Sequence, residues 1–256
     1  EAQSAIKEIV AFIKGTFQEQ GFKHLVIGVS GGIDSALALT LATQALGVEA
    51  ILPLLLPYGK QDMTDAEQII AFNRLPVANV QVFNIKAVVD DLLHLAGETS
   101  LGADQLRLGN MMARVRMTLI FDRAKKEQAL VCGTENKSEH LLAYYTRFGD
   151  EASDLEPIGH LYKTEVRLLA EALNLPKIFL DKAPSAGLWL GQSDEVELGF
   201  SYELADQVLA AHFDLGLSEK EILAAEELKN LPAEQVKAVF ARLKAVAFKE
   251  KVPYRI

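Results

Sequence analysis

The chain begins with a stretch in which apolar residues recur every three or four positions. Over residues 4–20 this spacing places one set of apolar side chains on a single helical face, namely Ile6, Ile9, Val10, Ile13 and Phe17. Gly21 follows at the position where a helix would end. We therefore expect an amphipathic helix that packs its apolar face against the core.

Short apolar runs then alternate with segments of helical spacing. The runs that predict strands are 25–29, 50–56, 80–85 and 129–132, and the segments that predict helices are 33–46, 64–72, 86–95 and 104–126. Alternation of this kind is typical of a parallel sheet covered on both faces. We predict an α/β fold with a doubly wound, mostly parallel sheet and helices on both faces.

The second half of the chain has one long segment without a regular pattern. Residues 181–200 contain one proline and three glycines at irregular spacing, which predicts a loop of the sort that often covers an active site. Beyond it, residues 218–221 form a capping box, and Pro232 precedes a further helix. We expect a single domain over residues 1–256, with additional C-terminal helices at 201–256 as a candidate small extension.

Composition narrows the classes of partner. The 256 residues are 50% hydrophobic, which is enough for a substantial core. A formal net charge of −9 repels a phosphate backbone, so we expect no nucleic-acid partner. The longest apolar run, 50–56, is far shorter than the roughly 20 residues that span a bilayer. With Cys132 as the single cysteine, no internal disulfide can form, and we expect a cytoplasmic protein without a membrane partner.

The first predicted strand leads directly into two glycines and the first turn of a helix, in the string Ser-Gly-Gly-Ile-Asp-Ser at 30–35. Glycines let the backbone approach a ligand closely, the helix N-terminus adds partial positive charge, and the Ser30 and Ser35 hydroxyls can donate to phosphate oxygens. A Walker A loop would carry a Lys-Ser/Thr pair after its last glycine, which is missing here. The string predicts a phosphate site that differs from those of ordinary ATPases and GTPases.

Two acidic residues lie where they can serve such a site. Asp34 would repel a phosphate unless a divalent cation bridged them, which favours a magnesium ligand over a simple helix cap. Glu139 belongs to a polar string after the predicted strand at 129–132, and parallel strands bring it to the same edge of the sheet. We interpret Asp34 and Glu139 as a magnesium site, although either carboxylate alone is equally typical of a helix start.

The loop at 30–35 resembles the ATP-pyrophosphatase superfamily, whose members transfer AMP to an oxygen of the substrate and release pyrophosphate. Three later strings, at 144–150, 154–164 and 184–199, make the chain similar to the NAD synthetases from residue 4 to about residue 253. The resemblance implies an adenine-nucleotide alpha-hydrolase-like fold. It also implies that the nicotinate carboxylate of deamido-NAD attacks the α-phosphate of ATP, after which ammonia displaces AMP.

The resemblance further implies roles for the matching positions. ATP would be bound by Gly28, Val29, Ser30, Gly31, Gly32, Ile33, Asp34 and Ser35, together with Thr134, Lys163 and Ser185. Deamido-NAD would be bound by Arg114, Arg147, Asp154 and Lys249, and Mg²⁺ by Asp34 and Glu139, which with Lys163 are the candidate catalytic residues. Arg147 stands where many relatives carry lysine, and Phe248 precedes Lys249 where some carry histidine. The other arginines of the 104–126 helix are expected on a solvated face.

Several alternatives remain open at this point. A tRNA-modifying or GMP-forming amidotransferase subunit would share the phosphate loop but need other substrate motifs and, for tRNA, a basic surface. A non-catalytic nucleotide sensor could share the fold, although both carboxylates and Lys163 argue against it. The resemblance implies a homodimer that uses free ammonia, because the chain has neither the length nor a plausible cysteine for a glutaminase domain.

Overall fold

The computed structural model describes all 256 residues except 101, 103, 186, 190, 250–252 and 255–256. Its sheet has four parallel strands, β1 (His24–Gly28), β2 (Ile51–Leu55), β3 (Gln81–Val82) and β4 (Ala129–Cys132), in the order β3-β2-β1-β4. The predicted parallel α/β sheet is confirmed, with a third strand shorter than predicted. Because the strand order reverses between β1 and β4, a crevice is expected at their carboxyl ends.

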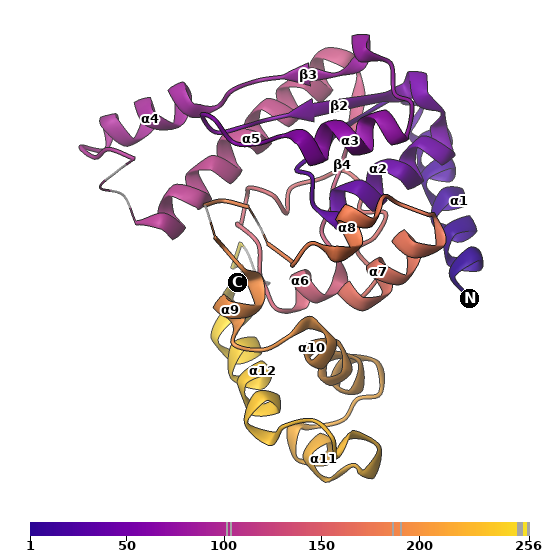
Figure 1. The fold of residues 1–256 in the computed structure, drawn as a ribbon, viewed down its shortest axis with the longest axis vertical. Helices are drawn as coiled ribbons and strands as arrows, with labels where there is room; N and C mark the ends of the chain where they lie inside the picture. Colours follow the sequence, from indigo (N-terminus) through magenta and orange to yellow (C-terminus); the bar gives the residue numbers. More distant parts are fainter. Residues whose placement is uncertain (101, 103, 186, 190, 250–252, 255–256) are drawn as a thin grey trace.

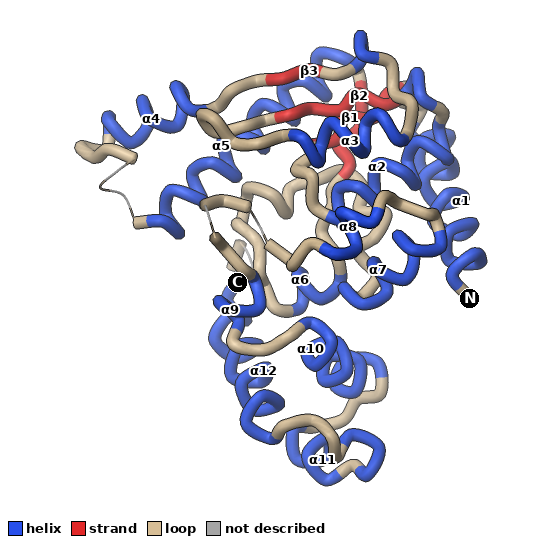
Figure 2. Tube along the Cα trace, viewed as in Figure 1, coloured by secondary structure: helices blue, strands red, loops and turns tan. Residues whose placement is uncertain are grey.

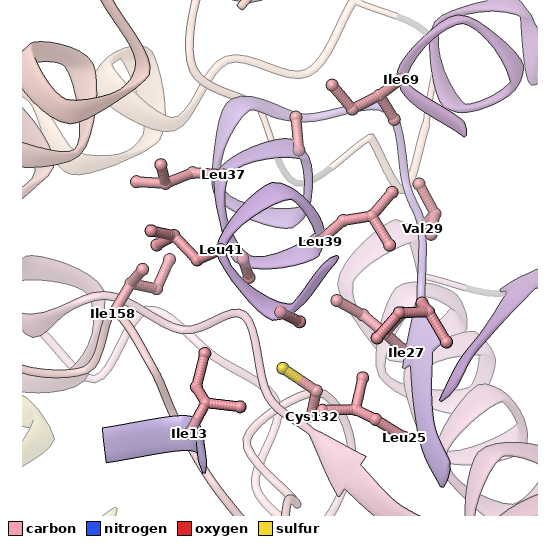
Figure 3. Close-up of a cluster of buried hydrophobic side chains, with 14 of the residues drawn as sticks. Ile13, Leu25, Ile27, Val29, Leu37, Leu39, Leu41, Ile69, Cys132 and Ile158 are labelled. Atoms are coloured by element: carbon pink, nitrogen blue, oxygen red, sulfur yellow. The ribbon is translucent and has the colours of Figure 1, made fainter. Parts of the chain in front are cut away.

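Helices cover both faces of this sheet (Figure 1). One face packs against α1 (Ala2–Gln20), α2 (Ile33–Leu46), α3 (Thr64–Phe72) and α7 (Lys163–Ala172), and the other against α4 (Lys86–Leu95) and α5 (Gln105–Glu127). Within β1, Leu25 and Ile27 enter the first apolar layer, which Figure 3 shows around α2, and Val26 enters the second. Burial on both faces explains why the strands are apolar throughout rather than alternating.

The remaining helices are short or C-terminal. They are α6 (Lys137–Leu141), α8 (Lys177–Asp181), α9 (Asp194–Leu198), α10 (Tyr202–Leu209), α11 (Glu219–Ala224) and α12 (Ala233–Val246). The last three lie together at the lower end of the molecule in Figure 1, around an apolar cluster of their own. Leu142 and Tyr162, which flank α6 and α7, belong to the same cluster. The C-terminal helices are therefore packed against the part of the chain that follows β4.

The structure departs from the sequence prediction within residues 181–200. We predicted one irregular loop, but α9 interrupts it, ended by Gly199 in the left-handed conformation with φ of 81°. Three acidic residues in the first turn of α9 favour a helix start there, a local signal that the irregular glycine spacing hides. The capping box of Ser218 and Glu221 is confirmed at the start of α11. Among the described residues, no helix is both long and apolar enough to cross a membrane.

Candidate active site

A cavity of about 780 Å³ opens at the carboxyl ends of β1 and β4, where the strand order reverses. Its walls come from the loops after both strands, from α5, from residues 143–152, from described residues between 182 and 198 and from residues 242–249. Figure 2 shows these loops gathered between the strands and helices α6 to α9. A volume of this size suits a nucleotide-sized ligand, since small-molecule pockets typically measure about 300–1,000 Å³.

The predicted phosphate loop forms one wall of the cavity. Most of its residues line the cavity, and Gly31 instead packs closely against Asp65 and Ala66 of α3. Gly31 has φ of +81°, and a Cβ atom there would lie 2.9 Å from the Cβ of Asp65 on α3. The N-terminus of α2 has no side-chain cap, while the Ser30 and Ser35 hydroxyls lie 3.1 Å apart beside it. An uncapped helix start flanked by hydroxyls fits an anion.

Gly31→Ala tests whether this backbone conformation is required. Strain at positive φ together with the contact at Asp65 is expected to lower the free energy of unfolding by about 2 kcal/mol, measured by urea denaturation. Gly15→Ala is the matched control, because a Cβ at that position in α1 meets nothing within 4 Å. Alanine should stabilise that helix by about 0.5–1 kcal/mol. Equal stability of the Gly31→Ala variant and the unaltered protein would contradict this account of the loop.

Three charged side chains meet at the floor of the cavity. The Lys163 ammonium, at the first position of α7, lies 2.6 Å from Asp34 Oδ2 and 2.8 Å from Glu139 Oε1. The lysine side chain is only 4% exposed, and each carboxylate is 16% exposed. The predicted neighbourhood of Asp34 and Glu139 is therefore present, with Lys163 between them. Helices that start far apart in the sequence supply all three groups.

Burial and mutual contact change the pKa values of Lys163 and Glu139. Burial disfavours the charged form of Lys163, but Asp34 and Glu139 outweigh it and raise its pKa above the ordinary lysine value. Burial also raises the pKa of Glu139, against the opposing pull of the Lys163 ammonium. The lysine thus stays a fixed positive charge, whereas Glu139 holds its proton more tightly than a solvated carboxyl does.

Asn136 joins the two carboxylates and was missed by the sequence analysis. Its Nδ2 donates to Asp34 Oδ1 at 2.8 Å, and its Oδ1 accepts from the backbone N–H of Glu139 at 3.0 Å, which caps α6. The side chain is fully buried. An asparagine three residues before a glutamate is a recognisable helix cap, but the bond to Asp34 spans 102 residues of sequence and carries no local signal.

Asn136→Ala is expected to lower kcat roughly ten- to a hundredfold, because groups that orient metal-site carboxylates usually contribute that much. Asn73→Ala is the matched control, since Asn73 donates to Thr40 Oγ1 and the Ile69 carbonyl away from the cavity. That variant should lose only about 1 kcal/mol of stability. Steady-state kinetics and thermal melting measure both. An equal effect of the two variants on kcat would exclude the orienting role.

The donors at this floor fit magnesium only together with a polyphosphate. Among the described residues, no group of three or more His, Cys, Asp or Glu side chains could hold a metal ion by itself. Magnesium in nucleotide sites commonly takes one or two carboxylates and completes its octahedron with water and phosphate oxygens. Asp34 and Glu139 both line the cavity beside the phosphate loop and provide such a pair.

The residues predicted to contact the dinucleotide lie mainly in a wall formed by α5, residues 143–152 and residues 242–249. Arg114 donates from Nε and Nη2 to the backbone carbonyl of Arg147, each at 3.3 Å. The Arg147 guanidinium lies over the rings of Phe148 and Phe248. Lys249 lines the same cavity, as do Thr134 and Ser185, the two residues predicted to contact ATP from outside the 28–35 loop and α7. This wall combines cations with exposed aromatic rings.

Lys249 and Asp154 also hold the protein backbone. Lys249 Nζ donates to the carbonyls of Ala143 and Tyr145, each at 2.8 Å, and burial lowers its pKa. Asp154 Oδ2 accepts from the backbone N–H of Val131 at 2.7 Å, at the edge of β4 that does not pair with β1, where Leu155 forms a parallel bridge with Cys132. Asp154 is not one of the described residues that line the cavity. Its role toward the dinucleotide stays a prediction.

For Arg116 the expected solvated position was wrong. Its Nε donates to the Leu56 carbonyl and its Nη2 to Gln61 Oε1, each at 3.0 Å, inside the cavity wall. Burial lowers its pKa to about 10. Arg116 lies four residues after the buried Met112, on the apolar face of α5, so the spacing of its neighbours carries the signal that was missed.

Comparisons with known proteins agree with the nucleotide-sized cavity and its phosphate loop. Residues 5–253 match the model of the family described as NAD synthase. The NH(3)-dependent NAD(+) synthetase of Pyrococcus furiosus is 41% identical over 251 residues, covering 98% of this chain and 93% of that protein. The solved NH3-dependent NAD synthetase of Campylobacter jejuni is 31% identical with a TM-score of 0.80, covering 100% and 99%. The solved NMN synthetase of Francisella tularensis is 28% identical with a TM-score of 0.83, covering 100% and 98%.

Proposed function

The chain belongs to the NAD synthase family, and we propose that it amidates deamido-NAD with ammonia at the expense of ATP, giving NAD, AMP and pyrophosphate. It is then a ligase that forms a C–N bond. The observation that carries the proposal is the Asp34, Lys163 and Glu139 cluster beside the phosphate loop in one cavity. Membership of the family leaves no support for the tRNA-modifying and GMP-forming alternatives.

In the proposed reaction, ATP and deamido-NAD bind at different walls of the cavity. ATP phosphates lie on the N-terminus of α2 beside the Ser30 and Ser35 hydroxyls, with Lys163 as a point charge and Thr134 as a further contact. The nicotinate carboxylate attacks the α-phosphate, and pyrophosphate leaves. Ammonia then attacks the carbonyl carbon, and AMP departs with the oxygen that linked it to that carbon.

Magnesium, held by Asp34 and Glu139, would supply positive charge where the leaving pyrophosphate becomes more negative. This chain's own contribution is to keep both carboxylates in place. Asn136 orients Asp34 and caps the helix that carries Glu139. Lys163 would pair with phosphate oxygens once the ion neutralised part of the charge of Asp34 and Glu139.

The segment at 182–198 is proposed to keep water from the adenylate. It is fastened to the rest of the cavity wall, because Lys182 pairs with Asp65 at 2.6 Å and Gln61 donates to the Gly187 carbonyl at 3.2 Å. Ser185 would contact ATP from this segment. Exclusion of water matters here because hydrolysis of the adenylate would waste ATP.

The remaining assignments are proposals at the same level. Arg114, Arg147, Asp154 and Lys249 bind deamido-NAD. Residues 1–256 act as one domain that includes the C-terminal helices, in a homodimer in the cytoplasm. Light scattering tests the dimer directly, since a mass of one chain, 28.1 kDa, would exclude it.

A second candidate is amidation of the nicotinate mononucleotide, favoured by the fit to the NMN synthetase of Francisella tularensis. The test offers the purified protein each nucleotide in turn with ATP, magnesium and ammonium. Deamido-NAD should give NAD, AMP and pyrophosphate in equal amounts. Turnover of the mononucleotide alone would favour the second candidate, and nucleotide binding without any AMP would indicate a sensor.

A further inference from the structure

A buried carboxylate outside the cavity lining holds the start of α7. Asp206 of α10 is 5% exposed. Its Oδ2 accepts from the backbone N–H and from the hydroxyl of Thr164, each at 2.8 Å, and its Oδ1 accepts from the Ser138 hydroxyl at 2.5 Å. An acidic group at the start of a helix is favourable because of the helix dipole, and here it also satisfies a free N–H.

The same cluster reaches the backbone of the catalytic lysine. The Ser138 hydroxyl, which donates to Asp206, accepts from the backbone N–H of Lys163 at 2.8 Å. Ser138 is fully buried and directly precedes Glu139 on α6. Asp206 therefore joins the first turns of the two helices that carry Glu139 and Lys163. Tyr202, on the same helix as Asp206, places its ring 5.3 Å from the Lys163 ammonium.

We propose that Asp206 is a positioning residue that fixes Lys163 between Asp34 and Glu139, so that the C-terminal helices complete the active site. This role of Asp206 rests on the proposed function only through the role of Lys163. The Lys163 ammonium has to be positioned to within a fraction of an ångström, because a small displacement weakens its stabilisation of the negative charge that develops in the transition state. Asp206 exerts its effect through Thr164 and Ser138 and touches no substrate.

The experiment compares Asp206→Ala and Asp206→Asn with Val208→Ala. Val208 is fully buried on the same helix in the C-terminal apolar cluster, so its truncation costs stability without touching the polar cluster. For each protein we would measure kcat, the KM for ATP and deamido-NAD, the melting temperature, and amide hydrogen exchange at Lys163 and Thr164. Asp206→Asn keeps one acceptor oxygen and nearly the same shape. It is therefore the variant to measure if Asp206→Ala does not fold.

Asp206→Ala is expected to lower kcat roughly ten- to a hundredfold with an unchanged KM for deamido-NAD, as loss of a supporting contact usually does. Exchange at Lys163 and Thr164 should accelerate relative to the rest of α7. Val208→Ala should melt at least as early and keep its kcat. Unchanged exchange and kcat in Asp206→Ala, or an equal loss of kcat in Val208→Ala, would overturn the proposal. If the unaltered protein made no NAD, the proposed function would fail, and the exchange data would still decide the role of Asp206.

Discussion

Asp34→Asn is expected to lower kcat roughly a hundred- to a thousandfold, the range seen when one preorganised electrostatic group is removed from a transition-state site. The amide keeps the shape of the side chain but loses the charge that faces Lys163 and that would hold magnesium. Glu139 still pairs with the ammonium, so no buried cation is left alone and the fold should persist. Steady-state kinetics with circular dichroism separates the two effects.

Asp122→Asn is the control for this substitution. Asp122 is exposed on α5, so the same change of charge should leave kcat and the fold unaltered. Turnover of the Asp34→Asn variant within a few-fold of the control would remove Asp34 from the proposed magnesium site.

Lys163→Met should impair both turnover and stability. Methionine keeps much of the side-chain length but leaves Asp34 and Glu139 facing each other without a cation. Breaking such a buried ion pair costs on the order of 3 kcal/mol of stability. Loss of the positive charge that Lys163 presents to ATP should lower kcat roughly a hundredfold or more. Magnesium should restore part of the stability, because an ion that binds only the folded state favours it.

Thermal melting with and without magnesium, together with steady-state kinetics, tests this variant. Lys229→Met is the control, since Lys229 pairs with Glu226 on an exposed surface where an ion pair is worth about 1 kcal/mol or less. A Lys163→Met protein as stable and as active as the Lys229→Met protein would show that the cluster at the cavity floor is not the catalytic centre.

The sequence predicted the elements whose signals are local. The α2 helix begins and ends where the spacing of its apolar residues and Gly47 predicted, and β4 has the predicted bounds. The glycine-rich turn at 30–35 was recognisable from its own residues, and it lies in the cavity wall. The proximity of Asp34 to Glu139 followed from the rule that parallel strands end at one edge of the sheet. These features depend on residues close together in the chain or on a general property of the fold.

Contacts between distant segments were beyond that reasoning. Asn136 bonds to Asp34 across 102 residues, and Asp206 bonds to Thr164 across 42. A polar residue gains such a partner only through the packing of several elements, so its own neighbours in sequence reveal nothing about the pairing. Arg116 was misplaced for a different reason. A charged residue on a helix is usually solvated, but Arg116 lies four residues after the buried Met112 on the apolar face of α5, and this spacing indicated burial.

Transfer of oxygen from the substrate tests the central claim most directly. Deamido-NAD labelled with ¹⁸O in the nicotinate carboxylate would be converted with ATP, magnesium and ammonium, and the AMP analysed by mass spectrometry. If the cavity adenylates the carboxylate, each AMP carries one ¹⁸O atom, because the bond to the carbonyl carbon breaks when ammonia attacks. AMP without label, or label in inorganic phosphate, would contradict it.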